Sequence, residues 1–192
     1  MKVSQEQKAQ NRDRILTEAG RLFREKGFDA VSVAEVMKAA GMTHGGFYGH
    51  FQSKDDLIAQ AIGHAAGSQS ATEDLDAFID TYLSPPHRDH PERGCPTAAL
   101  AGLMRRQSSE ARASMTEVVA SQINRLADAL PGADAAERRL AAIGNWSAMV
   151  GALILSRSID DPKLSAELLS QTRVWIDVKR LPDPSMRKRR AT

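Results

Sequence analysis

The chain has 192 residues and a formal net charge of +2, with 42% hydrophobic and 26% charged residues. This composition is typical of a globular protein with one ordinary domain or two small ones, and it argues against a disordered chain. The longest apolar run, residues 148–155, is far shorter than the ~20 residues of a membrane span, and the N-terminus lacks an apolar signal core. Cys95 is the only cysteine, which argues against a framework of disulfides. We therefore expect a cytoplasmic protein without a membrane partner.

Helical periodicity dominates the N-terminal part of the chain. Between residues 5 and 26, apolar side chains at positions 15, 16, 19, 22 and 23 fall on one helix face, and Gly27 is placed to end that helix. Ser32 followed by Glu35 forms a capping box, which predicts a short helix up to residue 40. Gly41 then breaks the pattern, and a second capping box, Ser53 with Asp56, opens another helix.

The rest of the chain is predicted to form longer helices. One falls within residues 71–83, one runs from a cap at residue 95 to about residue 106, one covers 115–126, one covers 134–157, and the last starts near residue 160. A proline-rich loop follows the first of these helices. Because no alternating strand pattern occurs in the sequence, we predict an all-α fold of about nine helices, with an N-terminal three-helix domain and a C-terminal helical domain.

The window 42–54, MTHGGFYGHFQSK, holds three glycines beside two histidines and three aromatic residues. Each interior glycine costs a helix about 1 kcal/mol relative to alanine, so such a run is expected where something approaches the backbone closely. Three short helices joined by tight turns describe a helix-turn-helix unit, whose recognition helix enters the major groove of DNA. Gly45 and Gly46 keep that surface free of bulk, and Thr43 presents a hydroxyl and a helix N-terminus to a phosphate.

The other side chains of this window fall into two sets. Phe47 and Phe51, four residues apart, are expected to anchor the helix in the core. Tyr48, His50 and Lys54 lie on the helix or just beyond it, where they can meet DNA. Taken alone, these residues also fit a plain loop with solvated histidines. The compact order of capping box, glycine turn, aromatic helix and second capping box favours DNA binding.

Residues 15–58, ILTEAGRLFREKGFDAVSVAEVMKAAGMTHGGFYGHFQSKDDLI, resemble the N-terminal domain of TetR/AcrR-family transcriptional regulators almost without a gap. The resemblance implies a homodimer that binds a pseudopalindromic operator, usually as a repressor, and that a small ligand releases or retains. It also implies phosphate contacts from Ser32, Thr43, Tyr48, His50 and Lys54, with His44 and Gly45 near the bases. The chain departs from the family in the glycine content of residues 46–49, which argues against a stiff recognition helix.

Small residues form a stripe along the predicted helix 134–157. They are Ala141, Gly144, Ala148 and Gly151. Such a stripe lets two helices approach closely, either inside one chain or across a dimer axis. The resemblance implies the dimer, in which Leu168 and Trp175 of the last helix complete a four-helix bundle.

A ligand pocket is expected between the helix that starts at residue 74 and the helix that carries Trp146. Its candidate lining is apolar and rich in methionine, which suits an adaptable cavity for a largely apolar effector. The candidates are Phe78, Tyr82, Leu100, Met104, Met115, Val119, Trp146 and Met149. The alternative is a core packed without a cavity.

No catalytic set of nucleophile, base and orienting group can be picked out, so we do not expect an enzyme. His87, His90 and Cys95 share one loop, but they lack a fourth ligand and match no zinc spacing, so neither a metal nor a cofactor is predicted. Cys95 is also a candidate redox sensor, because a helix N-terminus and the nearby Arg88 and Arg93 favour a thiolate. The alternative for Cys95 is a quiet capping residue.

The expected organisation is a helix-turn-helix domain over residues 1–52, a ligand-binding and dimerisation domain over 53–180, and a disordered basic tail over 181–192. Between residues 179 and 190 there are six Lys or Arg side chains and one acidic side chain. The tail either solubilises the protein or adds non-specific phosphate affinity. The alternative function is therefore an architectural DNA-binding protein, which would show little sequence preference and no ligand response.

Overall fold

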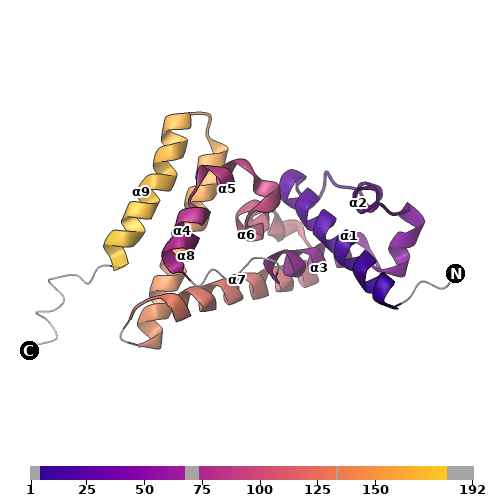
Figure 1. Cartoon of the computed structure of the whole chain (residues 1–192), viewed down its shortest axis with the longest axis horizontal. Helices are drawn as coiled ribbons and strands as arrows, with labels where there is room; N and C mark the ends of the chain where they lie inside the picture. The colour runs from indigo at the N-terminus through magenta and orange to yellow at the C-terminus, as the bar shows by residue number, and fades with distance from the viewer. Residues whose placement is uncertain (1–4, 68–73, 133, 181–192) are drawn as a thin grey trace, which may run out of the picture. The chain divides into compact units, whose positions relative to one another are not determined.

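The computed structural model describes residues 5–67, 74–132 and 134–180. Over these ranges the chain forms helices and turns without a strand, so the all-α prediction is confirmed. The elements shown in Figure 1 are α1 (Gln5–Lys26), α2 (Val33–Ala39), the 3-10 helix η1 (His44–Gly49), α3 (Lys54–Gly67), α4 (Leu75–Tyr82), α5 (Pro85–Asp89), η2 (Pro91–Arg93), α6 (Pro96–Leu100), η3 (Ala101–Arg106), α7 (Ser109–Ala129), α8 (Ala135–Ser158) and α9 (Pro162–Arg180).

The chain divides into two compact units. The first takes residues 1–71 and 89–122, and the second takes residues 72–88 and 123–192. Helix α7 therefore contributes its first part to one unit and its last part to the other. The predicted basic tail, residues 181–192, lies outside the described residues.

The first unit is built on α1 and α3, which pack along each other (Figure 1). Ile15, Ala19 and Phe23 of α1 are buried together with Leu57 and Ile62 of α3. Ile15, Ala19 and Phe23 recur every four residues, which places them on one face of α1. Burying an aliphatic or aromatic side chain of this size contributes about 1.5–3 kcal/mol, so this shared face is what holds the two helices together.

Two glycines make the turns that separate the short helices of this unit. Gly27 has φ 78° and Gly41 has φ 70°, a region that other residues enter only with strain. The Gly27 amide donates to the Phe23 carbonyl at 2.8 Å, and the Gly41 amide donates to the Lys38 carbonyl at 3.0 Å. Both glycines therefore end a helix in the way their positions in the sequence predict.

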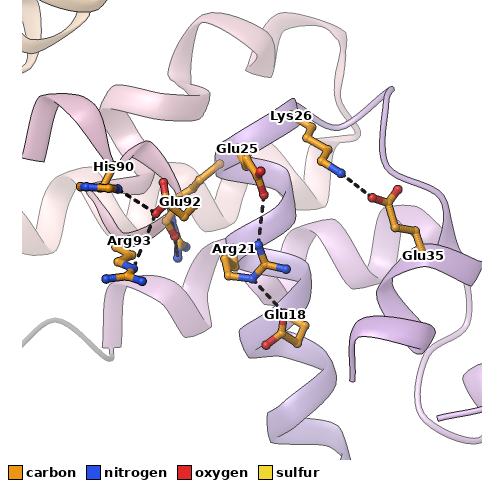
Figure 2. A network of polar contacts seen from close by, with 9 residues as sticks. Glu18, Arg21, Glu25, Lys26, Glu35, His90, Glu92 and Arg93 are labelled. Carbon is orange, nitrogen blue, oxygen red and sulfur yellow. Dashed lines mark hydrogen bonds and ion pairs between the residues drawn. The ribbon is translucent and has the colours of Figure 1, made fainter. Parts of the chain in front are cut away.

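Several ion pairs lie on the exposed side of the first two helices. Figure 2 shows Arg21 of α1 between Glu18 at 2.9 Å and Glu25 at 3.0 Å. Lys26 at the end of α1 reaches Glu35 of α2 at 2.7 Å, which ties the two helices across the turn. Exposed pairs of this kind add little stability, so the buried face, rather than these charges, decides the packing.

The second unit is built on α8 and α9, which lie side by side (Figure 1). Met149 and Leu153 of α8 are buried, as are Leu169 and Ile176 of α9. Helix α8 starts at Asp134, whose carboxylate accepts the Glu137 amide at 2.9 Å. This cap agrees with the helix start that the sequence predicts.

Hydrogen bonds of Arg157 and Arg88 hold α5 against both long helices of this unit. Arg157 of α8 donates to the Arg88 carbonyl at 3.0 Å and to the His87 carbonyl at 2.5 Å. The Arg88 guanidinium in turn donates to the Ser165 hydroxyl of α9 at 3.0 Å, and that hydroxyl donates to the Ser156 carbonyl at 2.7 Å. These hydrogen bonds provide donors for main-chain carbonyls that would otherwise be costly to bury.

Helix α8 is also the one helix of the described ranges that is long and apolar enough, by length and composition, to cross a membrane. The apolar run identified in the sequence is only part of it. In the structure, 39% of the most apolar window of α8 is buried inside the protein, and the core helix of a soluble protein meets the same criterion.

Candidate DNA-binding site

The window rich in glycine and aromatic residues forms η1, a 3-10 helix of six residues. Its three glycines are poor α-helix formers, which is in keeping with a short 3-10 helix at this place. Phe47 is 1% exposed and Phe51 is 2% exposed, and their rings stack at 5.6 Å. The two aromatic side chains therefore seat η1 on the core, as their spacing predicts.

The opposite side of η1 faces solvent. Tyr48 is 72% exposed, and His44, Gly45 and Gly49 are exposed beside it. A Cβ atom added at Gly45 or Gly49 would meet no other heavy atom within 4 Å, chain neighbours aside. Because packing inside the protein does not require these glycines, their lack of side chains instead leaves a low surface that another molecule can approach closely.

Two hydroxyl side chains stand at the starts of α2 and η1. The Ser32 hydroxyl accepts the Glu35 amide at 3.1 Å, which confirms the predicted capping box. Thr43 occupies the N-cap position of η1, but its side chain makes no capping hydrogen bond. The exposed Thr43 hydroxyl is thus available to a phosphate.

His50 is the C-cap residue of η1 and is half-buried. Burial lowers the pKa of the imidazole, and the positive charges of Lys8 and Arg12 lower it further. The ring is therefore neutral at pH 7. Its Nδ1 atom is buried without a hydrogen-bond partner among the described residues, which leaves Nε2 as the atom that can donate to a phosphate.

Lys54, the first residue of α3, is held against the protein. Its ammonium group donates to the Phe28 carbonyl at 2.6 Å. This bond ties α3 to the segment between α1 and α2. An ammonium group has three donors, so Lys54 can keep this bond and still contact a phosphate.

Arg12 belongs to this site, although it is not among the residues predicted from the sequence. Its guanidinium donates to the His50 carbonyl and to the Gln60 side chain, and it lies over the Phe51 ring at 4.5 Å from the centroid. One signal was available, because Arg12 stands three residues before Ile15 and so lies near the buried face of α1.

Residues 15–61 match the model of a protein family described as bacterial regulatory proteins, tetR family. This match covers most of α1, all of α2 and η1, and the start of α3, and it includes every site residue described above except Arg12. The N-terminal domain is that of a TetR-family regulator. The resemblance drawn from residues 15–58 is thereby confirmed.

Similar proteins carry the same domain. Over 51 residues, which are 27% of this chain and 24% of the relative, the sequence is 43% identical to the HTH-type transcriptional regulator AcrR of Shigella flexneri. Over 65 residues, which are 34% of this chain and 31% of the relative, it is 34% identical to the HTH-type transcriptional repressor BepR of Brucella suis. These matches span less than a third of either relative.

A solved structure extends the likeness to the C-terminal part. A TetR-family transcriptional regulator from Agrobacterium tumefaciens superposes with a TM-score of 0.69 and covers 88% of this chain and 97% of its own. The sequence identity is only 19%, so this comparison shows a shared fold. The predicted architecture of an N-terminal helix-turn-helix followed by a C-terminal helical domain is confirmed.

The six predicted interface residues lie on α8 and α9 of the TetR-like fold. A Cβ atom added at Gly144 or Gly151 would find open space within 4 Å. Trp175 is 45% exposed, and several aliphatic side chains of both helices are exposed nearby. An apolar groove of about 690 Å³ runs along this face, lined by Ala148 of α8 and by Leu164, Leu168, Val174, Trp175 and Val178 of α9.

The predicted ligand-lining residues are divided between the cores of the two units. The members in the first unit are Leu100, Met104, Met115 and Val119, and those in the second are Phe78, Tyr82, Trp146 and Met149. In the second unit the Tyr82 ring packs on Phe78, His87 and Trp146, with centroid distances of 5.9, 4.6 and 5.2 Å. The buried Trp146 indole nitrogen has no hydrogen-bond acceptor within the described part of the chain.

Cys95 occupies the N-cap position of α6 but is only 3% exposed, and its side chain makes no capping bond. Of the two expected cationic neighbours, Arg93 points to solvent and pairs with Glu92 (Figure 2). Arg24 of α1 also interacts electrostatically with Cys95. Burial lowers the pKa of Arg24, and the interaction with Cys95 partly offsets that effect.

Proposed function

We propose that this protein is a homodimeric, sequence-specific DNA-binding transcriptional regulator that acts as a repressor in the cytoplasm and is not an enzyme. One observation carries the proposal: η1 presents the exposed Tyr48, His44 and two unobstructed glycines on a surface that Phe47 and Phe51 fix to the core. A helix-turn-helix reads DNA with the first residues of such an element while neighbouring hydroxyl and basic groups bind phosphates.

The assignment of individual contacts follows from exposure and available donors. Thr43 and Tyr48 present hydroxyl groups to the phosphates, and Ser32 does so from the start of α2. His50 donates from a neutral ring, and Lys54 supplies a positive charge. His44 and Gly45 at the start of η1 approach base edges, where the absence of a side chain at position 45 allows close contact.

Dimerisation is proposed through the apolar face of α8 and α9. The groove beside Trp175 exposes apolar surface that a second copy would cover, while Ala141, Gly144, Ala148 and Gly151 would let two α8 helices approach. A two-fold dimer brings two identical helix-turn-helix units to the two halves of a palindrome. Leu168 and Trp175 would then lie in the interface.

Release from DNA is proposed to follow binding of a largely apolar small molecule in the second unit. The aromatic cluster around Tyr82 offers an apolar lining, and the Trp146 indole nitrogen offers a buried donor that an oxygen of the effector would satisfy. Modification of Cys95 is a second route to release. Because the thiol is 3% exposed, a reagent reaches it only when the first unit opens locally.

Selection from a random duplex library tests the DNA-binding proposal. The protein is expected to enrich an inverted repeat whose half-sites lie about one helical turn, ~34 Å, apart. A library that stays random after several rounds would favour the architectural alternative, in which binding depends on phosphates alone.

Fluorescence tests the effector proposal. Trp146 and Trp175 are the two tryptophans of the chain, so a Trp175→Phe variant reports on Trp146 alone. Compounds from a library of apolar molecules with one oxygen acceptor should change that emission in the variant, and the same compounds should weaken binding of the parent protein to the selected duplex. Compounds that release the DNA without altering Trp146 emission would place the effector elsewhere.

A further inference from the structure

The recognition element η1 has few means of holding its own shape. Three of its six residues are glycine, and the Thr43 side chain does not cap its first turn. Its last residues are closed by two bonds to one acceptor, from the His50 amide at 2.9 Å and the Phe51 amide at 3.0 Å to the Phe47 carbonyl. The orientation of η1 therefore depends on contacts from other elements.

Arg12 of α1 provides three such contacts. One guanidinium nitrogen donates to the His50 carbonyl, and a second donates to the Gln60 side-chain oxygen. The plane of the group lies over the Phe51 ring at 4.5 Å. A planar guanidinium can serve two acceptors and an aromatic face at once, whereas an ammonium group cannot match this geometry.

The acceptor on α3 is itself held in place. The Gln60 amide group donates to the Asp56 carboxylate at 2.5 Å, and the other oxygen of Asp56 accepts the Gln52 amide at 2.9 Å. The Asp56 amide donates to the Ser53 hydroxyl at 3.0 Å, which completes the cap of α3. Arg12 therefore connects the end of η1 to a fixed point at the start of α3.

We propose that Arg12 is a positioning residue that fixes the C-terminal end of η1, so that the exposed face of η1 meets DNA in one orientation. The role rests on the proposed DNA-binding function, but it is distinct from a phosphate contact. Arg12 is half-buried, and two of its three guanidinium nitrogens already donate to protein acceptors. Its positive charge interacts with the Phe51 ring and the His50 carbonyl inside the unit.

The test compares Arg12→Ala, Arg12→Lys and Gln60→Ala with the parent protein on a duplex that the parent selects from a random library. Arg12→Lys keeps the positive charge but loses the planar guanidinium that donates to two acceptors. Gln60→Ala removes the side-chain acceptor on α3 without changing any charge. Arg112→Ala, which removes an exposed arginine of α7, is the matched control for charge. Affinity is measured at several salt concentrations, for the selected duplex and for a scrambled duplex.

Positioning predicts that Arg12→Ala and Arg12→Lys both lose about tenfold or more in affinity for the selected duplex, with an unchanged salt slope and a smaller loss of affinity for the scrambled duplex. Gln60→Ala should act in the same direction and less than additively with Arg12→Ala. A salt slope that falls by about 1, or full rescue by Arg12→Lys, would show that Arg12 acts through its charge and would overturn the proposal.

Hydrogen exchange in the DNA-free protein gives a readout that does not depend on DNA binding. Arg12→Ala should speed exchange of the His50 and Phe51 amides, while amides in the middle of α1 stay protected. Equal exchange at His50 and Phe51 in parent and variant would contradict the role of Arg12. If the parent selects no duplex, the DNA-binding function fails, and this comparison still decides whether Arg12 holds η1.

Discussion

The neighbouring residues Phe47 and Tyr48 should separate the folding of the DNA-binding unit from its function. Phe47 is 1% exposed and contacts the Phe51 ring at 5.6 Å, whereas Tyr48 is 72% exposed. Truncation of a buried phenylalanine removes its transfer free energy and leaves a cavity, at a cost of about 3–5 kcal/mol. The Tyr48 ring meets the Phe47 ring edge-on with a centroid distance of 5.2 Å, so truncation of this exposed side chain should cost only about 0.5–1.5 kcal/mol.

Phe47→Ala should therefore shift the urea midpoint of the helical circular dichroism signal strongly, and Tyr48→Ala should shift it much less. A loss of about 3–5 kcal/mol is a large share of the 5–15 kcal/mol that typically holds a domain folded. In DNA binding the expected order differs. Tyr48→Ala should lose affinity while it stays folded, because it removes a hydroxyl from the exposed face of η1.

The milder variant Tyr48→Phe isolates that hydroxyl. It should weaken binding by a similar factor on the selected duplex and on a scrambled one, since a phosphate contact carries no sequence information. A Tyr48→Ala variant that unfolds as readily as Phe47→Ala would refute the division of η1 into a buried and an exposed face. An unchanged stability of Phe47→Ala would refute it equally.

Four further results are expected. Gly144→Trp should block close approach of two α8 helices and yield monomer in light scattering, so a dimeric variant would remove this face from the interface. Burial lowers the pKa of His87, so the unfolded chain binds more protons and stability should fall as pH drops below about 6.5. Thermal melts of His87→Gln should show a weaker dependence on pH, since the lowered pKa of His50 leaves part of it, whereas those of the exposed His90→Gln should keep the full dependence. Lys54→Ala should lower the salt slope of DNA binding by about 1, and an unchanged slope would show that its bond to the main chain is its whole role. Oxidation should release the parent protein from DNA and leave Cys95→Ser bound, and a parent that stays bound would exclude the thiol as a sensor.

Local patterns in the sequence were sufficient for the long helices and for the two faces of η1, but α5 (Pro85–Asp89) and η2 (Pro91–Arg93) lie where the sequence predicted a proline-rich loop. The capping residue Ser32, the turn glycines Gly27 and Gly41, and the spacing of Phe47 and Phe51 act within a few residues of chain. Their effects can therefore be read from spacing alone. The 3-10 form of η1 was not predicted, because the spacing of Phe47 and Phe51 does not distinguish a 3-10 helix from an α-helix over so short a segment.

Contacts between distant segments could not be predicted in this way. Arg12 donates to His50 and to Gln60, which lie 38 and 48 positions later in the chain. Lys54 donates to a main-chain carbonyl, an acceptor that every residue offers. The candidate ligand residues show the same limit. Buried apolar side chains at helical spacing look alike in every helix, so the pattern did not reveal that Met115 and Met149 belong to different units.

The most direct test of the central claim is the ratio of affinities for the selected duplex and for a scrambled duplex of equal length and composition, measured at one physiological salt concentration. A sequence-specific regulator predicts a ratio of about 10³ or more, because base contacts add to a phosphate term that both duplexes share. Affinities within tenfold of each other would contradict the claim and identify the protein as a non-specific DNA binder.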